Sequence, residues 1–304
     1  MLSLQDLRHD PDTAKAALAK RGEDGFPAAV DQVLSVDEER RKTIAQVEEL
    51  KARRNEVSKE IGAIKREGGD AEGQILEMRA VGDKISALDA VVSGADEKIR
   101  ELLLGIPNLP FSEVPPGGEE DNVLIRTWGE PTSFPFQGRP HWELGETLGI
   151  LDLPRGAKVS GSGFPLLRGK GARLQRGLID YMLDLHTREH GYEELRIPYL
   201  VTEESMVGTG QLPKFADESY LSDRDGLWLV PTAEVPVTNL YRDELLAEAE
   251  LPKRFTAYSP CFRREAGAAG KDTRGLLRVH QFDKVELVRY ETPDRSKDAL
   301  EELT

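Results

Sequence analysis

A regular stripe of apolar residues between positions 75 and 102 is the feature that most limits how this chain can fold. Its members, which step along the sequence by three or four residues, are Ile75, Met78, Val81, Ile85, Leu88, Val92, Ala95, Ile99 and Leu102. This spacing is close to a heptad seam and predicts a long helix that packs against a second helix. A similar pattern runs from about Phe26 to Arg66, and a glycine-rich turn at Gly68, Gly69 and Gly73 separates the two stretches. The sequence therefore predicts an antiparallel coiled-coil hairpin.

A hairpin with about thirty residues in each helix would extend roughly 45 Å, at about 1.5 Å per residue. That is too long for the core of a chain of 304 residues, so we expect it to project as an arm. Its first helix is locally basic, with nine Lys or Arg against seven Asp or Glu between positions 37 and 66, in a chain whose net charge is −14. Two interpretations fit this pattern. The arm binds RNA, or its charges simply occupy the outer positions of a coiled coil, where mixed charges are common.

The overall composition excludes several classes of protein. The acidic balance argues against a protein that coats nucleic acids non-specifically, because such binding depends on neutralising phosphates with Lys and Arg. The single cysteine, Cys261, cannot form an intramolecular disulfide, and the N-terminus has neither the basic nor the apolar region of a signal peptide. No apolar run approaches the roughly 18 residues of a membrane span. We therefore expect a cytoplasmic protein that binds neither membranes nor DNA.

A proline- and glycine-rich stretch divides the chain. We expect a helical arm over residues 1–104, a linker over 105–122 and a second domain over 123–304. The patterns in the second domain predict an edge strand at 123–128, helices at 141–151 and 174–190, and a strand at 192–201 that contains Pro198. The predicted fold class is α+β, with a mostly antiparallel sheet flanked by helices.

The stretch from Tyr258 to Val288 is typical of two strands joined by a long, basic, glycine-rich loop. Alternating positions of its second half, which should share one face of a strand, carry Arg278, His280, Phe282, Lys284 and Glu286. Arginine can clamp a phosphate, an aromatic ring can stack on a base, and a carboxylate can accept hydrogen bonds from an amine or a hydroxyl. This face suits a nucleoside triphosphate beside a small polar substrate. A charged, solvated hairpin without a ligand would show the same charge pattern.

The sequences of several stretches resemble those of the seryl-tRNA synthetases, a family of the class II aminoacyl-tRNA synthetases. FRREAG at 262–267 and RGLLRVHQFDKVEL at 274–287 are similar to motif 2 of that class, and MVGTGQLPKFADESY at 206–220 and PTAEVPVTNLY at 231–241 are similar to the substrate-side loops of the family. The helix that leads into the proline-containing strand at 192–201 resembles motif 1, which forms the dimer interface. The resemblance implies an N-terminal helical arm followed by a class II synthetase-like antiparallel sheet.

The resemblance further implies a two-step reaction that uses ATP, Mg²⁺, L-serine and tRNA. Serine is activated to seryl adenylate, and the seryl group is then transferred to tRNA(Ser), with tRNA(Sec) as a second candidate acceptor. No covalent enzyme intermediate is needed, which fits a site populated by arginines rather than by nucleophiles. The arm would bind tRNA, and motif 1 would form a homodimer.

Individual roles follow from the same resemblance. Arg263 and Arg278 would be the catalytic residues: Arg263 would bridge the substrate carboxylate and the α-phosphate, and Arg278 would hold the terminal phosphate. The implied ATP contacts, in which Glu265 reads the adenine amino group and Phe282 stacks on the base, are Arg263, Arg264, Glu265, Arg278, Val279 and Phe282. The implied serine contacts are Thr232, Ala233, Glu234, Arg263 and Glu286. The candidate tRNA contacts are Arg40, Arg41, Arg53 and Arg54 on the arm and Lys271 and Arg274 in the loop. No metal ligand is assigned.

Three other motifs lack residues that their chemistry requires. GFPLLRGKG at 163–171 has the wrong glycine spacing for a P-loop, and Gly171 replaces the required Ser or Thr. His186 and His190 could share a metal, but no third ligand is evident, and an exposed helix face is the competing interpretation. Cys261 has no Cys, His and Asp arrangement around it, so we expect a small buried thiol.

The third class II motif, a glycine-rich run with an arginine that holds ATP, is expected beyond Thr304. Thr292, Pro293 and Asp294 open a final helix that shows no C-terminal signal. We therefore expect the 304-residue chain to be a fragment that does not make seryl adenylate at a useful rate by itself. A non-catalytic protein that binds tRNA and dimerises is one alternative. A ligase that adenylates an amino acid for a carrier protein is another, against which the long arm argues.

Overall fold

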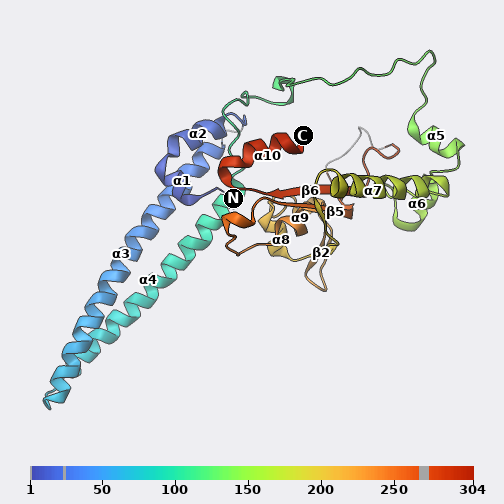
Figure 1. Ribbon diagram of the computed structural model, residues 1–304. Coiled ribbons are helices and arrows are strands. Elements are labelled where there is room, and N and C mark those ends of the chain that lie inside the picture. Colours follow the sequence, from blue (N-terminus) through green and yellow to red (C-terminus); the bar gives the residue numbers. More distant parts are fainter. Residues whose placement is uncertain (1, 23–24, 267–273) are drawn as a thin grey trace. The chain divides into compact units, whose positions relative to one another are not determined.

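The computed structural model describes residues 2–22, 25–266 and 274–304. The chain divides into two compact units, Met1–Gly129 and Glu130–Thr304 (Figure 1).

The first unit opens with α1 (Leu4–His9) and α2 (Pro11–Ala19). Ser3 and Asp10 cap these helices, because each side-chain oxygen accepts a hydrogen bond from a backbone N–H of the first turn. A buried apolar cluster joins the two helices to the beginning of the next helix and the end of the one after it. Its members are Leu7, Ala14, Leu18, Val30, Val33, Ile99, Leu103 and Ile106.

The predicted hairpin is formed by α3 (Gly25–Arg66) and α4 (Glu72–Gly105), which lie side by side in antiparallel directions (Figure 1). The 42 residues of α3 extend about 63 Å at about 1.5 Å per residue, more than the sequence estimate, because that estimate counted only about thirty residues for each helix. All nine apolar residues of the predicted seam in α4 are buried or half-buried, whereas most positions between them are exposed. The coiled-coil prediction is confirmed. Gly68 lies in the turn at φ +75°, whereas Gly73 lies inside α4.

A buried carboxylate ties the helices of this unit together. Asp37 of α3 is 0% exposed and accepts two hydrogen bonds of 2.6 Å from Arg8 of α1 and one of 3.1 Å from Arg41. Arg40 forms an ion pair of 3.5 Å with Asp37 and one of 2.5 Å with Asp96 of α4. Burial raises the pKa of Asp37, but the hydrogen bonds and charges of Arg8 and Arg41 outweigh burial and hold the pKa below its ordinary value.

The second unit is built on a long antiparallel ladder between β5 (Lys253–Phe262) and β6 (Gln281–Tyr290). The short strand β1 (Glu193–Glu194) pairs with β5 in parallel, which gives the order β1-β5-β6. Helix α7 (Lys170–Arg188) contacts both long strands. The predicted pair of strands joined by a loop is confirmed, but β6 begins at Gln281, so Arg278 and His280 lie before the strand.

A second, smaller sheet is fully antiparallel. It contains β2 (Leu200–Val201), β3 (Leu221–Ser222) and β4 (Leu227–Leu229) in the order β2-β4-β3. Residues 230–238 include α9 (Glu234–Thr238) and contribute to two buried clusters. One cluster contains Val201, Met206, Leu212, Val230 and Val235, and the other contains Ile197, Ala233, Val237, Phe255 and Ala257. This packing fixes residues 230–237 against the long ladder.

Short helices complete the two units. They are η1 (Glu119–Asp121), α5 (His141–Thr147), α6 (Leu153–Ser160), α8 (Glu203–Gly208), η2 (Ala216–Glu218), η3 (Glu248–Glu250), η4 (Pro293–Arg295) and α10 (Ser296–Leu303). Thr292 is the N-cap residue of η4, and Pro293 follows in the first turn, as predicted. In the part of the chain that the structure describes, no helix combines the length and apolar content that crossing a membrane requires.

Three local predictions are wrong. Residues 123–128 form no strand; their apolar side chains are largely exposed, up to 97% for Trp128, because alternation alone supplies no partner for the backbone. The stretch 192–201 is not one strand but contributes β1 and β2 to different sheets, with Pro198, which lacks an N–H, between them. The helix predicted at 141–151 ends at Thr147, since Gly149 adopts φ +65°.

The arginine cluster around Asp37 generates a stability prediction. We expect Asp37→Asn to lower the free energy of unfolding at pH 7 by about 2 to 3 kcal/mol, because the partly exposed arginines lose their buried anion. A carboxyl whose pKa is depressed in the folded state stabilises the fold above its unfolded pKa, and this contribution is lost as the pH falls through the folded pKa. The deficit should therefore shrink in acid.

Urea denaturation at pH 7 and at pH 3 measures this change. Glu38→Gln is the matched control, because Glu38 is adjacent in α3 and pairs only with Lys42 at the surface. A deficit of equal size at both pH values would contradict the assignment.

Candidate active site

One face of the β5–β6 ladder carries much of the predicted site. The pairs that share this face are Ala257 with Glu286, Ser259 with Lys284 and Cys261 with Phe282. The three β5 residues are small and 0% exposed. Next to them, the Phe262 backbone N–H donates to the Val230 carbonyl oxygen at 2.9 Å. Residues 230–234 are thereby held beside the long β6 side chains.

Thr232 connects this segment to β6 through its hydroxyl group. The hydroxyl donates to Oε2 of Glu286 at 2.6 Å and accepts hydrogen bonds from Nζ of Lys284 at 2.7 Å and from the Glu234 backbone N–H at 3.1 Å. Lys284 and Glu286 also form an ion pair. The hydroxyl therefore uses its one proton and both lone pairs. The structure brings the predicted residues Thr232 and Glu286 together and adds Lys284 to them.

Glu234 adds a second carboxyl group beside this cluster. Burial raises its pKa, and the charge of Glu286 raises it further, whereas Lys284 lowers it. An ammonium group bound here would relieve the repulsion between the two carboxylates. Ala233, which lies between Thr232 and Glu234, is fully buried and can contribute only its backbone.

Arg263 lies directly after β5, next to the same segment. Its guanidinium carbon is 5.1 Å from the centre of the Phe282 ring, and its Nε donates to the Pro231 carbonyl oxygen at 3.4 Å. A positive charge therefore lies over an aromatic face. It also contacts Pro231, the residue that precedes Thr232 in the chain. The arrangement places a phosphate-binding group, a flat ring and a small polar cluster in one region.

The other predicted nucleotide contacts lie at the two ends of the loop. Glu265 and Arg278 pair with each other, with Oε2 and Nε 2.9 Å apart, and Glu265 adopts φ +49°, which is uncommon for a residue with a side chain. The Arg264 backbone N–H donates to the Glu218 carbonyl oxygen at 2.8 Å. Val279 lines an apolar pocket instead of the polar cluster.

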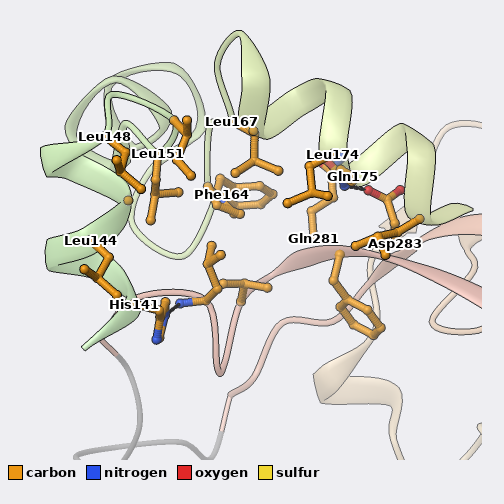
Figure 2. Close-up of a pocket in the computed structure, with 18 residues that line it drawn as sticks. His141, Leu144, Leu148, Leu151, Phe164, Leu167, Leu174, Gln175, Gln281 and Asp283 are labelled. Atoms are coloured by element: carbon orange, nitrogen blue, oxygen red, sulfur yellow. Dashed lines mark hydrogen bonds between the residues drawn. The ribbon is translucent and has the colours of Figure 1, made fainter. Parts of the chain in front are cut away.

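That pocket, of about 640 Å³, lies between α5, α7 and the first residues of β6 (Figure 2). Gln281, Phe282 and Asp283 line it, and because strand side chains alternate, Gln281 and Asp283 stand on the face of the ladder opposite Lys284 and Glu286. Its apolar lining includes Leu144, Leu148, Leu174, Leu178, Leu276 and Val279.

The same pocket has a polar edge. Asp283 accepts hydrogen bonds from the Gln175 amide and, at 2.7 Å, from the Tyr258 hydroxyl. Burial and the bond to Asp283 raise the pKa of Tyr258, which keeps the hydroxyl protonated as a donor.

The basic residues predicted to contact tRNA differ in how their charges are used. Arg40 is 23% exposed and is paired with two carboxylates, and Arg41 is bound to Asp37. Arg53 is 54% exposed, with a loose ion pair of 3.5 Å, and Arg54 is half-buried. Arg53 therefore presents more of its charge to a ligand than Arg40 does.

The two predicted loop contacts lie in the second unit. Arg274 stacks its guanidinium group 5.1 Å from the centre of the Trp142 ring in α5. Lys271 lies outside the described residues.

Cys261 and the pair of His186 and His190 have the following surroundings. Cys261 is a buried thiol on β5 as expected, and burial raises its pKa. Nδ1 of His186 and Nδ1 of His190 are 3.0 Å apart and form a hydrogen bond. Over residues 2–22, 25–266 and 274–304, no group of three or more His, Cys, Asp or Glu side chains could hold a metal ion.

Sequence reasoning gave no role to several residues that shape the site. Lys284 and His280 stand at alternating positions of the predicted face, so the sequence pattern could have identified them as site residues. Gly163, which touches His280, and Gln175, which binds Asp283, are more distant along the chain. Nothing in their local sequence points to the ladder.

Sequence comparison identifies relatives for both units. Residues 1–110 match the family described as seryl-tRNA synthetase N-terminal domain, and residues 216–304 match the family described as tRNA synthetase class II core domain (G, H, P, S and T). A serine–tRNA ligase of Methylacidiphilum infernorum (isolate V4) is 52% identical over 303 residues, which cover 100% of this chain and 72% of that protein. A serine–tRNA ligase of Geobacillus kaustophilus (strain HTA426) is 52% identical over 305 residues, with the same coverage.

Solved structures agree. A seryl-tRNA synthetase of Pyrococcus horikoshii complexed with ATP is similar over 100% of this chain and 72% of its own, with a TM-score of 0.91 and 34% identity. A cytoplasmic serine–tRNA ligase of Naegleria fowleri in complex with AMP covers 96% of this chain and 67% of its own, with a TM-score of 0.81 and 27% identity.

Proposed function

Because the chain belongs to the seryl-tRNA synthetase family, we propose that the product of its complete gene activates L-serine with ATP and transfers the seryl group to tRNA(Ser). The observation that carries this proposal is the polar cluster of Thr232, Lys284 and Glu286 beside a guanidinium group that lies over an aromatic ring. tRNA(Sec) is a second candidate acceptor.

The proposed chemistry has two displacements. A carboxylate oxygen of serine attacks the α-phosphorus of ATP, the bond to the β-phosphate oxygen breaks, and pyrophosphate leaves. A hydroxyl of the terminal tRNA ribose then attacks the seryl carbonyl, and AMP leaves. Both steps depend on positioning and on offsetting phosphate charge, which arginines supply without a nucleophilic side chain.

The polar cluster is suited to serine on chemical grounds. Glu286 and Glu234 would bind the ammonium group, which would relieve their mutual repulsion, and the serine hydroxyl would enter the hydrogen bonds now made around Thr232. A site whose buried polar groups are left unpaired by a substrate without a hydroxyl discriminates strongly against that substrate. Ala233 would contribute its backbone.

The nucleotide would lie along Arg263 and Phe282. Arg263 would bridge the serine carboxylate and the α-phosphate, Phe282 would stack on adenine, Glu265 would accept from the adenine amino group, and Arg278 would hold the terminal phosphate. Similar structures that hold ATP and AMP support nucleotide binding. Arg264 and Val279 would contribute backbone contacts at the two ends of the loop.

Mg²⁺ normally accompanies ATP in such reactions by neutralising phosphate charge. In the described part of the chain no trio of metal-binding side chains is arranged to hold it. In the proposed steps the arginines supply the protein's own share of the charge that offsets the phosphates.

Replacing Arg263 tests the adenylation role. We expect Arg263→Ala in the product of the complete gene to lower serine-dependent ATP–pyrophosphate exchange by at least a hundredfold, because removing a preorganised cation from a reacting phosphate costs on the order of 3 kcal/mol. Arg188→Ala, which removes an exposed α7 arginine paired with Asp184, is the control and should leave exchange unchanged. A loss of exchange of less than tenfold in the Arg263 variant would contradict the proposed role of Arg263 in adenylation.

We propose that residues 1–104 act as the tRNA-binding arm, joined by 105–122 to a catalytic domain over 123–304. The hairpin of α3 and α4 presents a basic first helix, on which Arg53 is 54% exposed and, unlike Arg40 and Arg41, is not paired with Asp37. Arg40 and Arg41 form ion pairs with Asp37. We therefore expect them to contribute to the stability of the fold as well as to tRNA binding.

Shortening the arm separates the two steps. Residues 45–92 should be replaced by a short glycine-rich turn, which retains the ion pair of Arg40 with Asp96 and the buried cluster around Ile99. We expect tRNA charging to fall at least tenfold through loss of phosphate contacts, while serine-dependent exchange stays within twofold. Circular dichroism checks the fold. If both activities fall together in a folded variant, the arm is structural.

We also propose a homodimer that uses the apolar side of α7. Leu174, Leu178 and Tyr181 recur at helical spacing and are exposed, as are Leu144 and Leu148 of α5, and exposed apolar patches of this kind mark interfaces. Sedimentation equilibrium should give the mass of two chains, and the mass of one chain would overturn this proposal.

A further inference from the structure

His280 makes an unusual connection at the end of the β5–β6 ladder. The last regular pair is Phe262 with Gln281, and at the next position the Arg263 backbone N–H donates to the His280 carbonyl oxygen at 2.9 Å. In a regular antiparallel pair the His280 backbone N–H would donate back to the Arg263 carbonyl oxygen. Instead it donates to the Gly163 carbonyl oxygen at 2.8 Å.

The imidazole ring makes the missing bond. Nδ1 of His280 lies 2.9 Å from the Arg263 carbonyl oxygen. A carbonyl oxygen can only accept, so Nδ1 carries the proton and donates it. One side chain thus completes the ladder beyond β5 and frees its own backbone N–H to hold a distant segment.

The ring itself is held on two sides. Phe164 stacks on it, with ring centres 5.3 Å apart and planes inclined by 29°. Gly163 lies against the ring so closely that a Cβ there would be 2.3 Å from Cδ2 of His280, and Gly163 also adopts φ +82°. Any larger residue at position 163 would displace the ring.

We infer that His280 is a positioning residue for Arg263, an inference that rests on the proposed function. Arg263 lies beyond the last regular ladder pair, yet its guanidinium group must stay over Phe282 and beside Pro231. The backbone N–H and carbonyl of Arg263 are both bound to His280, at 2.9 Å each. Fixing both groups limits the backbone rotations that would carry the guanidinium group away from the α-phosphate.

The competing interpretation is that His280 only anchors residues 163 and 164. The two interpretations require different groups of His280. Positioning of Arg263 requires the N–H at Nδ1, whereas anchoring of residues 163 and 164 requires the backbone N–H and the ring face.

Three variants of the complete gene product separate these roles. His280→Phe retains the ring and removes the donor, His280→Asn retains a short side-chain N–H donor and removes the ring, and Phe164→Leu removes the stacking partner alone. Steady-state kinetics of serine-dependent ATP–pyrophosphate exchange gives kcat and KM for ATP, and thermal denaturation reports stability. Loss of the one hydrogen bond that would position Arg263 corresponds to about a tenfold change in rate.

We expect His280→Phe to lower kcat about tenfold, His280→Asn to recover most of that loss, and Phe164→Leu to change kcat less than threefold. The inference would be overturned if His280→Phe and Phe164→Leu lowered kcat equally and in proportion to their loss of melting temperature. It would also be overturned if His280→Phe left kcat unchanged. In the background of Arg263→Lys, replacing His280 should have a smaller effect, because the two residues act together.

A readout independent of activity separates failure of this inference from failure of the proposed function. If the wild-type protein shows no exchange with serine, the proposed function fails. Nitrogen-15 NMR of the histidine rings in the wild-type protein then tests the bond directly. A proton on Nδ1 of His280 at pH 7 that exchanges slowly with water supports the connection to Arg263, and a proton on Nε2 alone overturns it.

Discussion

The hydroxyl of Thr232 is the interaction on which the site depends. Its single proton and two lone pairs are all used, by Glu286, Lys284 and the backbone N–H of Glu234. Because Thr232 is 3% exposed, an unpaired group there would carry its full desolvation cost, on the order of 1 to 3 kcal/mol. The segment that carries Thr232 is itself held by apolar clusters. Packing therefore holds the polar groups in a single geometry, which suits the proposed binding of a small polar substrate.

The β5–β6 ladder supports two different surfaces because side chains alternate along it. Phe282, Lys284 and Glu286 stand beside small β5 residues and form the polar site, whereas Gln281 and Asp283 face the apolar pocket under α7. His280 links the two sides at the end of the ladder through Arg263 and Gly163. A change on the pocket side can thus reach Arg263 through the contacts of His280.

Patterns with a strong period could be predicted from the sequence, and long-range contacts could not. The apolar seam at 75–102 predicted the helical hairpin. The sequence of residues 262–287 indicated the family and its candidate site residues. The strand at 123–128 was wrong because alternation says nothing of a partner, and the strand at 192–201 was wrong because Pro198 divides it. The hydrogen bond of Lys284 with Thr232 spans 52 positions, and the arginine cluster at Asp37 spans two helices. Neither leaves a local pattern.

The central claim is that the cluster around Thr232 binds the serine hydroxyl while Arg263 and Phe282 bind ATP. The most direct test compares serine with alanine in ATP–pyrophosphate exchange by the product of the complete gene. The account predicts exchange with serine and a kcat/KM for alanine lower by about 10⁴-fold, because alanine lacks the hydroxyl that the polar cluster would bind. Comparable exchange with alanine, or tRNA binding without any exchange, would contradict it.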